Sequence, residues 1–165
     1  MAFTESEAYL QLKSIFKGDL VSPTDNNYKE SVKRWSILAE RPAGVVAFVR
    51  DEWDVSAAVK LAVEAKLEIA IKGKSRLLQS RVIPSMLGEL TGLGGGHNPS
   101  GASSSDGGLV IDLSKHLNKV TVDQHARIAH VEGGALWSDV DAATFPFGLA
   151  TVGGTVSEVS DVSPL

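Results

Sequence analysis

The stretch VVAFVRDEWDVSAAVKLAVEAKLEIAIK, residues 45–72, decides the fold. It opens with the continuous apolar run 45–49, which is typical of a buried strand. Asp54 is placed to cap a helix, and residues 68–72 form a second strand candidate. The apolar residues of the helix keep the spacing of one helical face: Val55, Val59, Ala62 and Val63. Strand, helix and strand over this length predict a βαβ unit with a right-handed crossover.

Further elements are expected on both sides of this unit. On the N-terminal side, a capping box from Thr4 to Glu7 opens a helix that Gly18 ends, and residues 19–27 form a turn-rich connector. On the C-terminal side, the pattern predicts a strand at 109–113, an antiparallel pair at 120–122 and 128–131, and a helix at 136–144. The sequence therefore predicts an α+β fold, with a βαβ unit, a mixed sheet and flanking helices.

Size and composition exclude several classes of protein. The 165 residues suit one domain or part of a larger one. A net charge of −4 and a pI near 5.5 argue against a nucleic-acid surface, which needs a cationic face. No apolar stretch is long enough to span a membrane, and the N-terminus lacks the pattern of a secretory signal. The absence of cysteine removes disulfides and thiolate chemistry. We expect a cytoplasmic protein.

The glycines gather in two regions, 88–108 and 148–154. The first contains GGGHNPSG, residues 94–101, in which successive backbone N–H groups can point into one concavity that suits a pyrophosphate. Each such bond to an ionised oxygen contributes about 1.5–3 kcal/mol. No acidic residue occurs between Glu89 and Asp106, so the region does not repel an anion. A flexible glycine-serine linker is the alternative interpretation.

Two other phosphate-binding motifs do not fit the sequence. A P-loop ending at Gly73–Ser75 would need glycine five residues before Gly73, where Glu68 stands. A dinucleotide fingerprint that begins at Gly92 would need glycine in place of His97.

Four segments in order carry a resemblance to a known family. They are GGHNPSG (95–101), GGLVIDLS (107–114), ARIAHVEGGALWSDVD (126–141) and ATVGGT (150–155). Over residues 41–159 the chain resembles the PCMH-type FAD-binding domain of the vanillyl-alcohol oxidase superfamily. Within it, the chain is most similar to berberine-bridge-enzyme-like and 6-hydroxynicotine-oxidase-like FAD-linked oxidoreductases. We therefore divide the chain into an N-terminal helix and connector (1–37), which the pattern predicts, and the incomplete N-terminal part of such a domain (38–165), which the resemblance implies.

The resemblance implies FAD as the cofactor and two loops that bind it. The loop for the pyrophosphate and ribityl chain would contain Gly95, Gly96, His97, Asn98, Ser100 and Gly101. The loop beside the isoalloxazine ring would contain Thr151, Gly153, Gly154 and Thr155. His97 matches the histidine that many members bond covalently to the flavin 8α-methyl carbon, and a neutral imidazole is a competent nucleophile for that bond. No catalytic residue of the family falls within the chain, and no metal site is expected.

The implied function is FAD-dependent oxidation of a small-molecule substrate, with oxygen as the expected reoxidant. The full-length protein would be such an oxidoreductase, whereas these 165 residues alone would have little or no turnover. The alternative is a catalytically inactive truncated product, or an FAD-binding module without turnover. The sequence leaves open the substrate, the electron acceptor and the oligomeric state.

The chain departs from the family at two places. Residues 74–93 form an atypical insertion, and the likeness ends after Val159. Retained introns would explain both departures, because codons for residues 73–75 can contain GTAAGT and codons for residues 159–161 can contain GTGAGT, which are splice-donor sequences. A looped insertion and a natural short form are the alternative.

Overall fold

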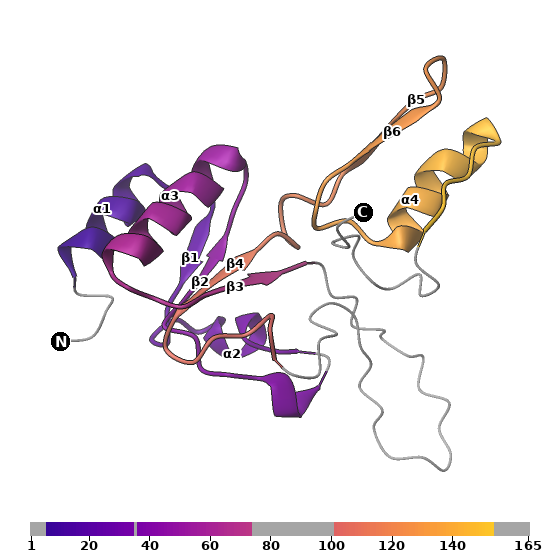
Figure 1. The fold of residues 1–165 in the computed structure, drawn as a ribbon. Coiled ribbons are helices and arrows are strands. Elements are labelled where there is room, and N and C mark those ends of the chain that lie inside the picture. The colour runs from indigo at the N-terminus through magenta and orange to yellow at the C-terminus, as the bar shows by residue number, and fades with distance from the viewer. Residues whose placement is uncertain (1–5, 35, 74–100, 154–165) are drawn as a thin grey trace, which may run out of the picture.

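The computed structural model describes residues 6–34, 36–73 and 101–153 of the chain (Figure 1). Its helices are α1 (Glu7–Ile15), α2 (Tyr28–Ser31), α3 (Glu52–Glu64) and α4 (Trp137–Thr144), with two 3-10 turns, η2 (Ile37–Ala39) and η3 (Phe145–Phe147). Its strands are β1 (Asp19–Val21), β2 (Val45–Phe48), β3 (Ile69–Lys72), β4 (Leu109–Asp112), β5 (Val120–Asp123) and β6 (Ile128–Val131). The predicted α+β fold is confirmed. The predicted insertion at 74–93 lies outside the described residues.

Four strands form a mixed sheet in the order β1-β2-β4-β3. β1 pairs antiparallel with β2, whereas β4 pairs parallel with both β2 and β3. The strands and helix predicted over residues 45–72 are present, but β2 and β3 do not pair with each other. β4 lies between them, with Val110 opposite Val46 on one side and Ala70 on the other.

Helices cover both faces of this sheet. The inner strands, β2 and β4, therefore bury side chains on both faces, which explains their continuous apolar sequence. Figure 1 shows α1 and α3 on one side of the sheet and α2 on the other. The core under α1 and α3 consists of Tyr9, Val45, Ala47, Val49, Ala58, Ala62, Leu109 and Ile111. The core on the α2 face consists of Val21, Ala43, Val46, Ala70 and Val110, with Tyr28 and Val32 packed against it.

The N-cap of α3 differs from the prediction. Asp51 caps the helix, because its carboxylate accepts a bond from the Asp54 backbone N–H at 3.0 Å. Asp54 lies in the first turn, where its buried carboxylate accepts bonds from the backbone N–H groups of Lys17 (2.9 Å) and Arg50 (3.0 Å). Asp54 therefore joins the start of α3 to the end of α1. The predicted apolar face is also partly wrong: α3 buries Ala58, Leu61 and Ala62 and leaves Val63 exposed.

The N-terminal region contains more regular structure than predicted. The described part of α1 begins at Glu7, with Ser6 as the N-cap that accepts a bond from the Tyr9 N–H at 3.2 Å; Thr4 lies outside the described residues. The predicted connector 19–27 includes β1, a short edge strand whose pairing with β2 overrides its turn-like composition.

An ion cluster joins β1 to the segment that follows β4. The Asp19 carboxylate accepts bonds from Lys115 Nζ at 2.6 Å and from His116 Nε2 at 2.9 Å. Hydrogen bonds from Lys115 and then His116 are the main reasons that the pKa of Asp19 lies below its usual 3.8. The cluster holds an edge strand to the centre of the sheet.

We expect the Asp19 cluster to make stability depend on acid pH. A carboxylate with a lowered folded pKa contributes stability above its unfolded pKa, and the contribution is lost as pH falls through the folded value. Urea unfolding between neutral pH and about pH 3 should therefore show a smaller loss in Asp19→Asn than in the wild type. The exposed Asp141→Asn is the matched control. Equal losses in wild type and Asp19→Asn would contradict the prediction.

The last described part is a separate two-stranded sheet with one helix. β5 and β6 pair antiparallel, as predicted, and α4 lies along them (Figure 1). The chain at Gly134 packs closely against the residue that follows β4. A Cβ at Gly134 would lie 2.4 Å from the carbonyl oxygen of Leu113, so only glycine allows this approach. Within the described ranges, no helix has both the length and the apolar character needed to cross a membrane.

Candidate functional site

The predicted cofactor residues divide into two groups. Outside the described residues lie Gly95, Gly96, His97, Asn98, Ser100, Gly154 and Thr155. The described ones are Gly101, Thr151 and Gly153. Gly101 lies at the sheet and the other two lie beside α4, so each predicted loop has a described end.

Gly101 occupies a position that requires glycine. It is buried and has a φ of +83°, a left-handed conformation that side-chain-bearing residues rarely adopt. A Cβ at this position would lie 3.2 Å from Nε of Arg41, which is tighter than ordinary contact. The backbone therefore passes close to a guanidinium group at the end of the first predicted loop.

Residues 101–108 are fixed to the segment that follows α2. The Arg34 guanidinium donates from Nε and Nη2 to the carbonyl oxygen of Ser103, at 3.0 and 2.7 Å. The Ser104 hydroxyl donates to the carbonyl oxygen of Ala39 at 2.6 Å. The return from the glycine-rich region to β4 is thus held by side-chain hydrogen bonds.

A buried ion pair lies where β3 and β4 end. Lys72 and Asp112 are register partners on these parallel strands, and Nζ of Lys72 lies 2.8 Å from Oδ2 of Asp112. Both side chains are almost fully buried, at 8% and 0% exposure. The other carboxylate oxygen of Asp112 accepts a bond from the Ser114 N–H at 2.8 Å. Ligands of open α/β sheets bind outside the carboxyl ends of the strands, which is where this pair lies.

Arg34 adds a positive charge on the same face of the sheet. Burial lowers the pKa of Arg34, while the negative charges of Asp112 and Glu40 act in the opposite direction. We call Arg34, Lys72 and Asp112 the buried charge cluster; two cations and one anion leave one formal positive charge. Glu40 also lies beside Arg34, since its Oε1 accepts a bond from the Arg34 backbone N–H at 3.3 Å, but its side chain is exposed and its charge is screened by water.

The described end of the second predicted loop lines a groove of about 960 Å³ between the β5–β6 hairpin and α4. Its walls combine apolar side chains with a nearly equal share of polar surface, and Thr151 and Gly153 line it. The lining residues that bear large apolar side chains are Val122, Ile128, Val131, Trp137, Val140, Leu149 and Val152. A groove of this size and character suits a flat aromatic ring system.

Gly153 packs directly on the indole of Trp137. A Cβ at Gly153 would lie 2.8 Å from Cε3 of the indole, a separation that real Cβ atoms do not show. The chain after α4 can therefore approach the helix this closely only with glycine at 153.

We expect Gly153→Ala to lower the free energy of unfolding by about 1–3 kcal/mol, the usual effect of overpacking. Thermal unfolding of the purified chain measures the loss. The adjacent Val152→Ala is the control, because Val152 is 96% exposed and its truncation should change little. The double variant with Trp137→Leu should recover part of the loss, and no recovery would mean that the clash lies elsewhere.

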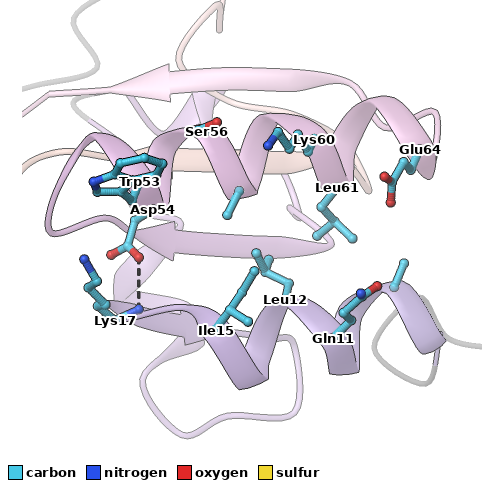
Figure 2. A pocket seen from close by; sticks show the side chains of 12 residues that line it. Gln11, Leu12, Ile15, Lys17, Trp53, Asp54, Ser56, Lys60, Leu61 and Glu64 are labelled. Atoms are coloured by element: carbon cyan, nitrogen blue, oxygen red, sulfur yellow. Dashed lines mark hydrogen bonds between the residues drawn. The ribbon is translucent and has the colours of Figure 1, made fainter.

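A second groove, of about 370 Å³, separates α1 from α3 (Figure 2). Leu12, Ile15 and Leu61 face one another across it. Its Asp54 carboxylate already accepts two backbone bonds, one of which Figure 2 shows as the dashed line to Lys17. The other charged residues that line it, Lys17, Lys60 and Glu64, have exposed side chains, and we interpret the groove as a packing gap between the two helices.

No sequence motif singles out the buried charge cluster. Lys72 ends the predicted strand 68–72 and Asp112 lies one residue before the end of the predicted strand 109–113, but only the strand register places them opposite each other. Arg34 has no such signal, because its partner Ser103 is 69 positions away. Across residues 6–34, 36–73 and 101–153, no three His, Cys, Asp or Glu side chains gather closely enough to hold a metal ion.

Comparison with known proteins gives a consistent picture. The model of a family described as an FAD binding domain matches residues 88–160, which include both predicted loops. The FAD-linked oxidoreductase pgmH of Aspergillus terreus is 31% identical over 157 residues, covering 93% of this chain and 27% of that protein. The (R)-6-hydroxynicotine oxidase of Paenarthrobacter nicotinovorans is 26% identical over 138 residues, covering 84% of this chain and 25% of that protein.

A solved structure agrees with these relatives. The 6-hydroxy-D-nicotine oxidase from Arthrobacter nicotinovorans superimposes with a TM-score of 0.71 and 26% identity, covering 88% of this chain and 27% of that one. A BBE-like protein of Physcomitrella patens shares the fold, with a TM-score of 0.69 and 16% identity. The chain spans about a quarter of the length of the relatives it matches.

Proposed function

Because the chain belongs to the FAD-linked oxidoreductases related to berberine-bridge-enzyme-like proteins and 6-hydroxynicotine oxidase, we propose that it binds FAD for the oxidation of a small-molecule substrate. The observation that carries the proposal is the match of the FAD-binding domain to residues 88–160. Bound FAD would supply two-electron oxidation of an organic substrate. The residues of the chain would hold and orient it.

The described residues fit an anionic dinucleotide with an aromatic ring. The left-handed Gly101 brings the backbone close to Arg41, whose guanidinium is suited to a phosphate oxygen. Arg34 of the buried charge cluster donates to the Ser103 carbonyl oxygen, two residues after Gly101. Thr151 and Gly153 border the groove beside α4, which suits the isoalloxazine ring. In the proposal, Gly95, Gly96, His97, Asn98 and Ser100 would complete the first loop, and Gly154 and Thr155 the second.

A binding experiment tests the proposal. The purified chain is mixed with FAD, separated from free flavin by gel filtration, and examined by absorbance. We expect flavin to elute with the protein at a ratio near one per chain. ADP and FMN serve as partial ligands, and each should bind more weakly than FAD because each contacts only part of the site. A folded protein that elutes without flavin at saturating FAD would refute the proposal.

We propose little or no turnover for these residues by themselves. The chain spans about a quarter of its relatives, and none of its predicted residues is a catalytic base. The measurement is oxygen consumption by the FAD-loaded chain with 6-hydroxynicotine as the probe substrate. Turnover well above that of free FAD would contradict this part of the proposal and leave FAD binding intact.

A further inference from the structure

Among the described residues, the buried guanidinium of Arg34 makes no hydrogen bond to a carboxylate. The residue follows α2 and is only 8% exposed. Its guanidinium donates to main-chain carbonyl oxygens: Nε and Nη2 to Ser103 at 3.0 and 2.7 Å, and Nη1 to Lys33 at 2.8 Å. Arginine is rarely buried to this degree unless it is paired, so the position needs an explanation.

Two donors of the guanidinium converge on one distant oxygen. Ser103 lies 69 positions from Arg34, so the contact joins two separate segments of the chain. The planar fork of arginine can place both N–H groups on one carbonyl oxygen, whereas lysine offers a flexible point charge. An apolar residue would fill the space at a lower desolvation cost but could not hold that oxygen.

The segment held in this way includes Gly101. Arg34, Ala39 and Arg41 all contact residues 101–104: Arg34 through the Ser103 carbonyl, Ala39 through the Ser104 hydroxyl, and Arg41 through close approach to Gly101. A short stretch of chain after α2 therefore fixes the backbone where the predicted first cofactor loop returns to the sheet.

We propose that Arg34 is a positioning residue for FAD: its guanidinium fixes the main chain at Ser103 and so sets the conformation of Gly101. The inference rests on the proposed function, because it assigns a residue to that same site. Arg34 acts through the backbone of residues 101–104. Its buried charge also favours the anionic ligand that this backbone would bind.

The test compares three variants of the whole chain. Arg34→Met removes the donors and the charge, and Arg34→Lys keeps the charge without the fork. Leu12→Ala is the matched control, because Leu12 is 3% exposed in α1 on the opposite side of the sheet. FAD affinity is measured by quenching of flavin fluorescence. Amide hydrogen exchange of residues 101–108 is measured without cofactor, which gives a readout that does not require FAD to bind.

We expect Arg34→Met to weaken FAD binding by about tenfold or more, since it removes charge-assisted bonds, and to speed exchange in residues 101–108. Arg34→Lys should recover part of both effects. Leu12→Ala should lower the melting temperature while its FAD affinity and the exchange of residues 101–108 stay close to wild type.

Each other outcome has a distinct meaning. If Arg34→Met binds FAD as tightly as Leu12→Ala does, the inference is overturned. A variant whose exchange rises equally in residues 101–108 and in β2 would assign Arg34 a merely structural role, which also overturns it. If the wild type binds no FAD, the proposed function fails, while exchange in residues 101–108 still decides whether Arg34 positions this segment.

Discussion

Asp112→Ala should lower the free energy of unfolding by about 3–5 kcal/mol, because it leaves a buried cation without its partner. Lys72 Nζ lies 2.8 Å from the Asp112 carboxylate, and the Lys72 side chain is only 8% exposed. The substitution also removes the acceptor of the Ser114 N–H. Both groups would lose their bonds at the carboxyl ends of β3 and β4. Urea unfolding of the cofactor-free chain measures the change.

Two further variants show whether the loss comes from the charge. Lys72→Met combined with Asp112→Leu removes both charges, and replacing a buried pair by apolar residues is often close to neutral. The double variant should therefore be more stable than Asp112→Ala. The exposed Asp141→Ala is the control for loss of an aspartate and should change stability by no more than about 0.5 kcal/mol. An effect of Asp112→Ala as small as that of Asp141→Ala would contradict the prediction.

His97→Ala should abolish all acid-stable flavin. The resemblance matches His97 to the covalent attachment residue, and alanine has no nucleophile to form the bond. After incubation with FAD in air, the wild-type protein precipitated with acid should retain yellow colour and flavin fluorescence. The variant should release its flavin to the supernatant.

The exposed His125 provides the matched control for this experiment. His125→Ala should retain acid-stable flavin at the wild-type level. His97→Ala should still bind FAD without a covalent bond, because the backbone and the buried charge cluster remain. Acid-stable flavin in His97→Ala would place the attachment elsewhere. Its absence from the wild type would remove the covalent prediction and leave noncovalent binding to be tested separately.

The elements that could be predicted from sequence are those with strong local patterns. β2 and β4 are short apolar runs, and the β5–β6 hairpin is an alternating pair around a turn. β1 could not be predicted, because three residues within a turn-rich segment form a strand only through pairing with β2. The sequence does not place the cap of α3, because Asp51 and Asp54 both suit a helix start and only the backbone partners of Asp54 distinguish them.

The sequence predicts the candidate site only at its glycines, where a close approach of the backbone requires a residue without a side chain. The glycine cluster indicated close backbone approach, and Gly101 and Gly153 each occupy positions that a side chain would disturb. The Lys72–Asp112 pair depends on strand register, which sequence periodicity does not give. The Arg34–Ser103 contact depends on how two distant segments pack. Long-range contacts between polar groups therefore had to come from the structure.

The place of β4 has a consequence for the nascent chain. β2, α3 and β3 leave the ribosome before β4, yet β2 and β3 do not pair with each other and both pair with β4, which is made later. Until Asp112 has emerged, the growing polypeptide exposes strand edges that can join to those of other molecules. We therefore expect chaperone dependence during synthesis to be greatest before that residue appears.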